Sequence, residues 1–267
     1  MSHTTQTRRL WLNLALLLLV GGLGAAAWWQ SNQPVKLPET LLSLTRADIT
    51  RVTITREPGS AKPDIIRLAR EGERWRMLEP KQGDTNPVRI SQLFTLLDET
   101  VTGSYDATGK DLKQYGLEPG EVRVAFNDQT VLFGTENPIS RSRYLLHAGK
   151  IQLVSEAVFG LLTGEATALL ANKLVPEGRN VKAVSLPEGF NAKAADVLQN
   201  WQSADAIRVE AYAGEMSKGQ ITLTLDDGSQ IVLDLLSSDG ELVLANIVSG
   251  VRYVMAETQW RHLLPAK

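Results

Sequence analysis

A unit of short strands followed by a helix occurs twice in this chain, and this repetition constrains the fold more than any other feature. A shift of 101 positions without gaps superimposes turn, strand and helix of the two copies. The coinciding pairs are Gly149 with Gly250, Val154 with Met255, Phe159 with Trp260 and Leu162 with Leu263. The same shift places Arg143 on Leu244. Repeats of about a hundred residues indicate duplicated subdomains, because solenoid repeats are much shorter. The sequence therefore predicts two similar lobes.

Local patterns in the first copy favour antiparallel sheet with one packed helix. Residues 49–57 alternate apolar and polar side chains, and residues 65–78 read as two strands around a turn at Glu71-Gly72. Residues 85–100 place apolar side chains at helical spacing, with Thr85 or Asn86 as the capping residue. We expect an amphipathic helix that packs on the sheet.

The repeat extends toward the N-terminal side of each copy. "VRVAFNDQTVLFG" (122–134) aligns with "LTLDDGSQIVLDL" (223–235) at the same shift, and the helix at Leu93 and Leu97 matches Val197 and Trp201 at a slightly different one. The predicted fold class is α+β, with an antiparallel sheet of hairpins and packed helices in each lobe. The predicted divisions are a cytoplasmic N-terminus (1–9), a transmembrane helix (10–29), a linker (30–43), a first lobe (44–172) and a second lobe (173–267).

The predicted transmembrane helix is the uncharged apolar stretch from Leu10 to Trp29. At about 1.5 Å per residue, a helix of this length reaches about 30 Å, which matches the hydrocarbon core of a bilayer. Arg8 and Arg9 precede it and favour a cytoplasmic N-terminus, while Trp28 and Trp29 suit the opposite interface. This pattern predicts a single-pass protein of the bacterial inner membrane whose body lies in the periplasm. The alternative is a cleaved signal peptide that ends before Trp28.

Composition excludes several classes of protein. The chain has 28 basic and 30 acidic residues, so it carries no positive field that would favour nucleic acid. It has no cysteine, which removes disulfides, thiol nucleophiles and cysteine-based metal sites. The three histidines show no metal-ligand spacing. We expect no metal, no cofactor and no nucleic-acid partner.

Four segments in order resemble a bacterial family. They are "GERWRMLEP" (72–80), "LKQYGLEP" (112–119), "LFGTENP" (132–138) and the following "RYLL". Together they resemble the uncharacterised membrane-anchored domain family that is often encoded beside gliding-motility-type ABC transporter auxiliary proteins. The resemblance implies an extracytoplasmic, single-span protein that works with transport machinery. It implies no known activity and no catalytic residues.

Residues that could suggest chemistry have simpler structural interpretations. The acidic run Asp226-Asp227-Gly228 stands where a hairpin turn is needed, and aspartate and glycine suit such turns. Trp75, Trp201 and Trp260 could stack on a sugar, but each holds a periodic apolar position that favours the core.

The loop from Gly134 to Arg143 is the best candidate for contact with a partner or ligand. It is polar, joins two predicted strands and offers donors that can bind a carboxylate or phosphate. The candidate residues are Glu136, Asn137, Ser140, Arg141 and Arg143. The alternative is an ordinary solvated connection.

These patterns predict a noncatalytic, membrane-anchored accessory or scaffold protein, and the resemblance implies that its partner is an ABC-type transporter or envelope complex. Two alternatives stay open. The chain could bind a small ligand in a cleft between the lobes, or it could be an envelope hydrolase whose paired acids meet only in space.

Overall fold

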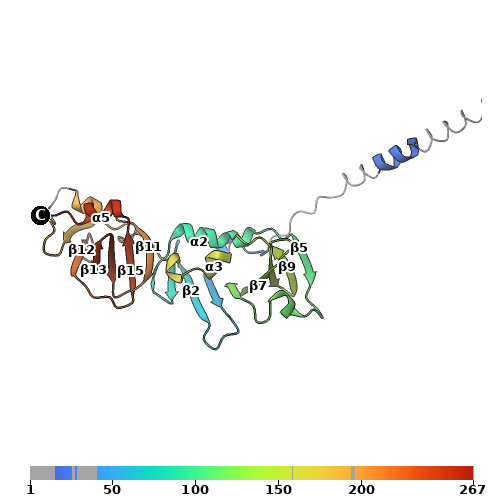
Figure 1. Ribbon diagram of the computed structural model, residues 1–267, viewed down its shortest axis with the longest axis horizontal. Helices are drawn as coiled ribbons and strands as arrows, with labels where there is room; N and C mark the ends of the chain where they lie inside the picture. The colour runs from blue at the N-terminus through green and yellow to red at the C-terminus, as the bar shows by residue number, and fades with distance from the viewer. Residues whose placement is uncertain (1–15, 26–27, 29–40, 158, 194–195, 267) are drawn as a thin grey trace, which may run out of the picture. The chain divides into compact units, whose positions relative to one another are not determined.

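The computed structural model describes residues 16–25, 28, 41–157, 159–193 and 196–266 (Figure 1). The chain divides into two compact units, 1–38 and 39–267. In the first unit, residues 16–25 are helical. The rest of the predicted Leu10–Trp29 span lies outside the described residues except for Trp28, and Arg8, Arg9 and Trp29 also lie outside them. Within the described residues, no helix has the length and apolar character needed to cross a membrane.

The second unit contains two antiparallel sheets, so it is a mixed α+β structure, as the sequence predicts. The first sheet has nine strands in the order β4-β3-β2-β1-β6-β7-β8-β9-β5. Its strands are β1 (Arg51–Arg56), β2 (Asp64–Glu71), β3 (Arg74–Glu79), β4 (Gly83–Asp84), β5 (Gly103–Asp106), β6 (Val122–Phe126), β7 (Gln129–Glu136), β8 (Arg143–His147) and β9 (Lys150–Val154). We call the body built on this sheet lobe 1.

The second sheet has six strands in the order β10-β12-β13-β14-β15-β11. Its strands are β10 (Val181–Ser185), β11 (Ala206–Ala211), β12 (Gly219–Leu225), β13 (Gln230–Asp239), β14 (Glu241–Asn246) and β15 (Val251–Met255). We call the body built on this sheet lobe 2.

The same six-stranded topology occurs in both sheets. The series β1-β6-β7-β8-β9-β5 in lobe 1 corresponds, strand by strand, to β10-β12-β13-β14-β15-β11 in lobe 2. The hairpin β2-β3 and the short strand β4 extend the sheet of lobe 1 only. The helices also correspond, because α2 (Pro87–Leu93) and α4 (Val197–Gln202) precede β5 and β11, while α3 (Phe159–Thr163) and α5 (Glu257–Leu263) follow the last hairpin.

The ungapped shift of 101 positions holds for the last strand of each lobe but not for the strand before it. Arg143 pairs with Val154 across the β8–β9 ladder, and Leu242 pairs with Met255 across β14–β15. The counterpart of Arg143 is therefore Leu242. The sequence alignment with Leu244 is wrong, because the turn before β15 is two residues longer than the Ala148-Gly149 turn before β9.

The helices pack on one face of each sheet, where the apolar sides of the strands form the core. The N-cap of α2 is Asn86, whose side chain accepts hydrogen bonds from the backbone N–H groups of Val88 and Arg89. This capping satisfies two donors that a helix start otherwise leaves unpaired. The chain then continues as the 3₁₀ helix η2 (Phe94–Asp98). The predicted amphipathic helix is confirmed, with Asn86 as its cap.

The tryptophans lie against the two cores, as the sequence predicts. Trp201 is fully buried, and its Nε1 donates to the carbonyl oxygen of Leu263 at 3.0 Å. Trp75 and Trp260 are partly buried, in lobe 1 and lobe 2 respectively. Tyr253 packs against both cores, so the two lobes share an apolar junction.

The connection from β5 to β6 is fixed to the end of β7 by two close backbone approaches. It contains the 3₁₀ helix η3 (Leu112–Tyr115), which ends at Gly116 with φ of 63°. A Cβ on Gly116 would lie 2.8 Å from the backbone nitrogen of Thr135, and one on Gly134 would lie 2.2 Å from the carbonyl oxygen of Tyr115. These contacts give a physical reason for glycine in both "YGL" and "LFG".

Replacing Gly134 by alanine should therefore destabilise the chain. We expect a loss of at least about 2 kcal/mol in the free energy of unfolding, because the new methyl group overlaps a backbone oxygen that cannot move freely. Gly160→Ala is the control, since nothing lies within 4 Å of a Cβ there. It should be neutral or slightly stabilising. Equal urea midpoints for the two variants would show that the close approach is not rigid.

Candidate binding groove

The predicted contact loop after β7 is organised by Asn137. Its Oδ1 accepts from the backbone N–H groups of Ile139 at 2.9 Å and Ser140 at 3.2 Å, and its Nδ2 donates to the Tyr144 hydroxyl at 2.7 Å. Asn137 therefore shapes the loop. Glu136 pairs with Arg141 at 2.8 Å, so both charges of this pair already have a partner. Ser140 and Arg141 are exposed, and their role in partner contact stays a prediction.

Arg143 lies in the interior of lobe 1 instead of at its surface. Its side chain is only 8% exposed. Its Nε and Nη2 donate to the two carboxylate oxygens of Glu156, both at 2.7 Å, and its Nη1 donates to Glu121 at 2.9 Å. The guanidinium also lies 3.4 Å from the ring centroid of Phe159. Arg143 is thus committed to intramolecular contacts and is not presented to a partner by this loop.

The charge of Arg143 is stabilised by these contacts. Burial alone would lower the pKa of Arg143, but the hydrogen bonds and charges of Glu156 and Glu121 outweigh it and raise the pKa above its ordinary value.

Two arginines hold helix α3 at its two ends. Arg143 binds Glu156 and Phe159 at the start of the helix. From β1, Arg56 donates through Nε to the carbonyl oxygen of Leu162 at 2.7 Å and also donates to the carbonyl oxygen of Gly164. A cation that donates to the last carbonyls of a helix satisfies acceptors that have no intrahelical partner. The position of α3 on the sheet is thus set by polar contacts as well as by the buried Leu162.

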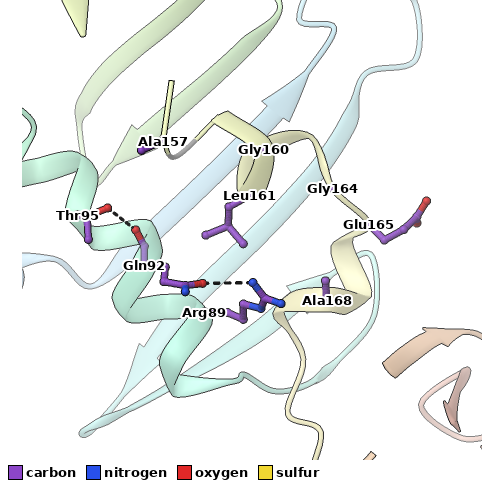
Figure 2. Close-up of a pocket in the computed structure, with 9 residues that line it drawn as sticks. All are labelled: Arg89, Gln92, Thr95, Ala157, Gly160, Leu161, Gly164, Glu165 and Ala168. Atoms are coloured by element: carbon purple, nitrogen blue, oxygen red, sulfur yellow. Dashed lines mark hydrogen bonds between the residues drawn. The ribbon is translucent and has the colours of Figure 1, made fainter. Parts of the chain in front are cut away.

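Lobe 1 contains a groove of about 480 Å³ (Figure 2). One side is formed by α2 and η2, and the other side is formed by α3 and the 3₁₀ helix η4 (Ala166–Leu169). Its two walls come from segments that lie far apart in the sequence. The lining residues are Arg89, Gln92, Thr95, Ala157, Gly160, Leu161, Gly164, Glu165 and Ala168.

The two walls differ in chemistry. On the α2 side, Arg89 Nη1 donates to Gln92 Oε1 at 3.3 Å, and Thr95 Oγ1 donates to the Gln92 carbonyl at 2.7 Å. On the opposite side, Leu161 points toward α2, whereas the carboxylate of Glu165 points away from the groove (Figure 2). The remaining residues of that wall are glycine or alanine. The groove therefore offers one cation and an amide facing a wall of small and apolar groups.

A second cavity of about 580 Å³ lies in lobe 1, where the β1–β2 turn meets the end of the β5–β6 connection. Arg56 and Glu121 line it, but both already bind other groups of the chain. Both cavities are lined by lobe 1 residues alone. Neither of them gives support to a ligand site between the lobes.

Carboxylates that lie together in lobe 2 are paired with arginine. Glu210 accepts from Arg208 at 3.0 Å and from Arg252 at 2.9 Å, and Glu215 also pairs with Arg252. The hydrogen bond from Arg208, followed by that from Arg252, lowers the pKa of Glu210. A lowered pKa keeps a carboxylate ionised, which does not suit the general acid of a hydrolase. In the part of the chain that the structure describes, no group of three or more His, Asp or Glu side chains could hold a metal ion.

This arginine–carboxylate network predicts a loss of stability in acid. Because the folded pKa of Glu210 is depressed, its contribution is present above the unfolded pKa and is lost as the pH falls through the folded pKa. We expect urea midpoints to be constant from about pH 7 to pH 5.5 and to fall below about pH 4.5. The double variant Arg208→Gln/Arg252→Gln should show a shallower fall, and Arg261→Gln should match the parent. Parallel curves for all three proteins would contradict this assignment.

Comparison of the chain with family models, with curated proteins and with solved structures finds no match.

The sequence did not identify the groove, because its walls lie about seventy residues apart in the chain. One signal was present. Ala157, Gly160, Gly164 and Ala168 place small residues three or four positions apart, the spacing of one helix face, although the structure has two short helices here, α3 and η4.

Proposed function

We propose that this chain is a noncatalytic, single-span, membrane-anchored module whose body lies outside the cytoplasm, and that it serves as an accessory or scaffold to an ABC-type transporter or envelope complex. In this proposal Leu10–Trp29 is the anchor, residues 30–43 are the linker, and the two lobes are the part that meets a partner. The shared six-stranded topology supports an origin of the lobes by internal duplication.

One structural observation supports the proposed membrane anchor most directly. The helical residues 16–25 expose large apolar side chains all along their length, between 55% and 72% of each. These side chains are Leu16, Leu17, Leu18, Leu19, Val20 and Leu23. Burying such groups is worth about 1.5–3 kcal/mol each, so a helix that exposes them in water is unfavourable and one in lipid is favourable.

Flanking residues support the orientation. Arg8 and Arg9 stand before the apolar stretch, and cytoplasmic flanks are enriched in such residues. Trp28 and Trp29 stand at the other end, where indole rings favour the interface.

The body supports a binding role over a catalytic one. Its buried arginine serves to position α3, and the acid cluster of lobe 2 is neutralised by Arg208 and Arg252. The groove of lobe 1 offers an apolar wall and one cation, which suits recognition of a partner surface. The resemblance of four lobe 1 segments to a transporter-associated family points to the same class of partner.

The full chain in its own membranes tests this proposal. After an alkaline carbonate wash it should stay in the membrane pellet, and Leu17→Arg/Leu18→Arg should release it, because a charge at the bilayer centre costs about 2.5–3.5 kcal/mol. Mild solubilisation should recover it with a stoichiometric membrane protein. Complete release of the parent chain by carbonate, or purification without such a partner even after crosslinking, would count against the proposal.

A further inference from the structure

The helices that border the groove in lobe 1 have counterparts that lie directly against each other in lobe 2. There, Trp201 of α4 donates to the carbonyl oxygen of Leu263 at the end of α5, and Asn200 donates to that of His262 at 3.1 Å. The large indole of Trp201 fills the space at this junction and has no exposed surface. No open groove is thus expected between α4 and α5.

In lobe 1 the corresponding helices are not joined in this way, and the carbonyl oxygen of Leu162, the counterpart of Leu263, accepts from Arg56 of β1 at 2.7 Å. Leu97 stands at the position of Trp201. It is smaller and has no donor, and it is itself buried in the core and does not line the groove. Among the described residues, no hydrogen bond joins α2 or η2 to α3. The groove of about 480 Å³ lies outside this buried layer, between Arg89, Gln92 and Thr95 on one side and residues of α3 and η4 on the other. The two lobes therefore differ at this junction, because the helices are joined by hydrogen bonds in lobe 2 and border a groove in lobe 1.

The charge in the groove is available. In the described part of the chain, nine arginines form ion pairs with carboxylates, but Arg89 is not one of them. Its hydrogen-bond partner is the uncharged amide of Gln92. Because an exposed cation gains most from a carboxylate held beside it by other contacts, the groove favours an occupant with an acidic group near Arg89.

The opposite wall favours a helix as the occupant. A Cβ on Gly160 would have no atom within 4 Å, so the space above this residue is empty. Small residues line this wall on α3, on the connection after it and on η4, and they leave room for the backbone of an incoming helix. Leu161 supplies an apolar contact in the same wall. An amphipathic helix that lies in a groove with its apolar side down is a common mode of recognition.

We propose that the groove between α2 and α3–η4 binds an amphipathic α-helix of a partner protein, with the apolar side of that helix on Leu161 and an acidic side chain at Arg89. This inference rests on the proposed role as a docking module and specifies its partner. The close approach at Gly160 provides shape selectivity, and Arg89 sets the orientation of the helix.

Two synthetic helical peptides test the proposal against the full chain in detergent micelles. Both peptides have the same apolar face of leucine and alanine. The residues that flank this face are glutamate in one peptide and lysine in the other. Fluorescence anisotropy should show at least about fivefold tighter binding of the glutamate peptide, the upper range for an exposed ion pair. Arg89→Glu should reverse this preference, and the control Arg261→Glu in lobe 2 should leave it unchanged.

Gly160→Leu tests the shape of the groove. It should abolish binding of both peptides, while Gly160→Ala, measured as a folding control, should retain the preference for glutamate. Equal affinities for the two peptides, no binding at all, or binding that survives Gly160→Leu would overturn the proposal. Preferential binding of sodium laurate would overturn it as well, because the groove would then take an anionic amphiphile. The peptide-binding results do not depend on whether the chain stays in the membrane. A negative result would therefore overturn the helix-binding groove, while the membrane-anchor proposal is decided by the carbonate wash.

Discussion

Trp201→Ala is expected to lower the free energy of unfolding by about 3–5 kcal/mol, the range for removing a fully buried aromatic side chain. Trp201 is 0% exposed and lies in the core of lobe 2. The substitution leaves a cavity that the short helix α4 cannot close, and it removes the donor that binds the Leu263 carbonyl at 3.0 Å. Equilibrium urea denaturation followed by tryptophan fluorescence and circular dichroism measures the change.

Trp260→Ala is the matched control in the same lobe. Trp260 lies on α5 and is only partly buried against the core, so the loss should be clearly smaller than for Trp201. A similar loss in both variants would mean that burial does not explain the effect. A loss below about 1 kcal/mol for Trp201→Ala would contradict the close packing of α4 on the sheet.

Arg143→Ala is expected to cost about 3 kcal/mol, near the lower end of the range for breaking a buried ion pair by removing one partner. The substitution deletes three hydrogen bonds to Glu156 and Glu121 and the contact with the ring of Phe159. Both glutamate side chains are 42% exposed and can turn to water, which limits the cost. Since Arg143 holds the start of α3, the groove should also lose its shape.

Arg141→Ala controls for the loss of one positive charge from the same segment. Arg141 is 80% exposed and pairs with Glu136, so its replacement should change the free energy of unfolding by less than about 1 kcal/mol. Arg143→Lys should recover only part of the stability, because an ammonium group cannot donate to both oxygens of Glu156 in the same plane. Identical denaturation curves for Arg143→Ala and Arg141→Ala would refute the interior role of Arg143.

Strand periodicity and turn residues were sufficient to predict antiparallel sheet and the capped helix, but not the strands β4, β5 and β11. The alternation in residues 49–57 corresponds to β1, and Asn86 caps α2. The alignment of the repeats was less accurate in β14, since sequence similarity alone does not detect two extra residues in a turn. The pairing of residues across strands fixes the register. Because side chains alternate between the two faces of a strand, an alignment that is wrong by two residues still predicts the same buried face.

The predicted contact loop illustrates a further limit of sequence reasoning. The polar composition of residues 134–143 groups Arg143 with this loop, although Arg143 alternates with Leu145 on the buried face of β8. That period of two was a usable signal for an interior arginine, and Glu156 at the start of the next segment could have been considered as its partner. The groove depends on two distant segments, so only the folded chain reveals it.

Cysteine accessibility tests the central claim, an anchored body outside the cytoplasm, most directly. The chain has no cysteine, so single substitutions report one position each. In spheroplasts treated with a membrane-impermeant maleimide, Ser140→Cys should be labelled at once, because Ser140 is exposed in lobe 1. Ser2→Cys, on the N-terminal side of Arg8 and Arg9, should be labelled only after lysis. Labelling of Ser2→Cys in intact spheroplasts, or protection of Ser140→Cys until lysis, would contradict the proposed topology.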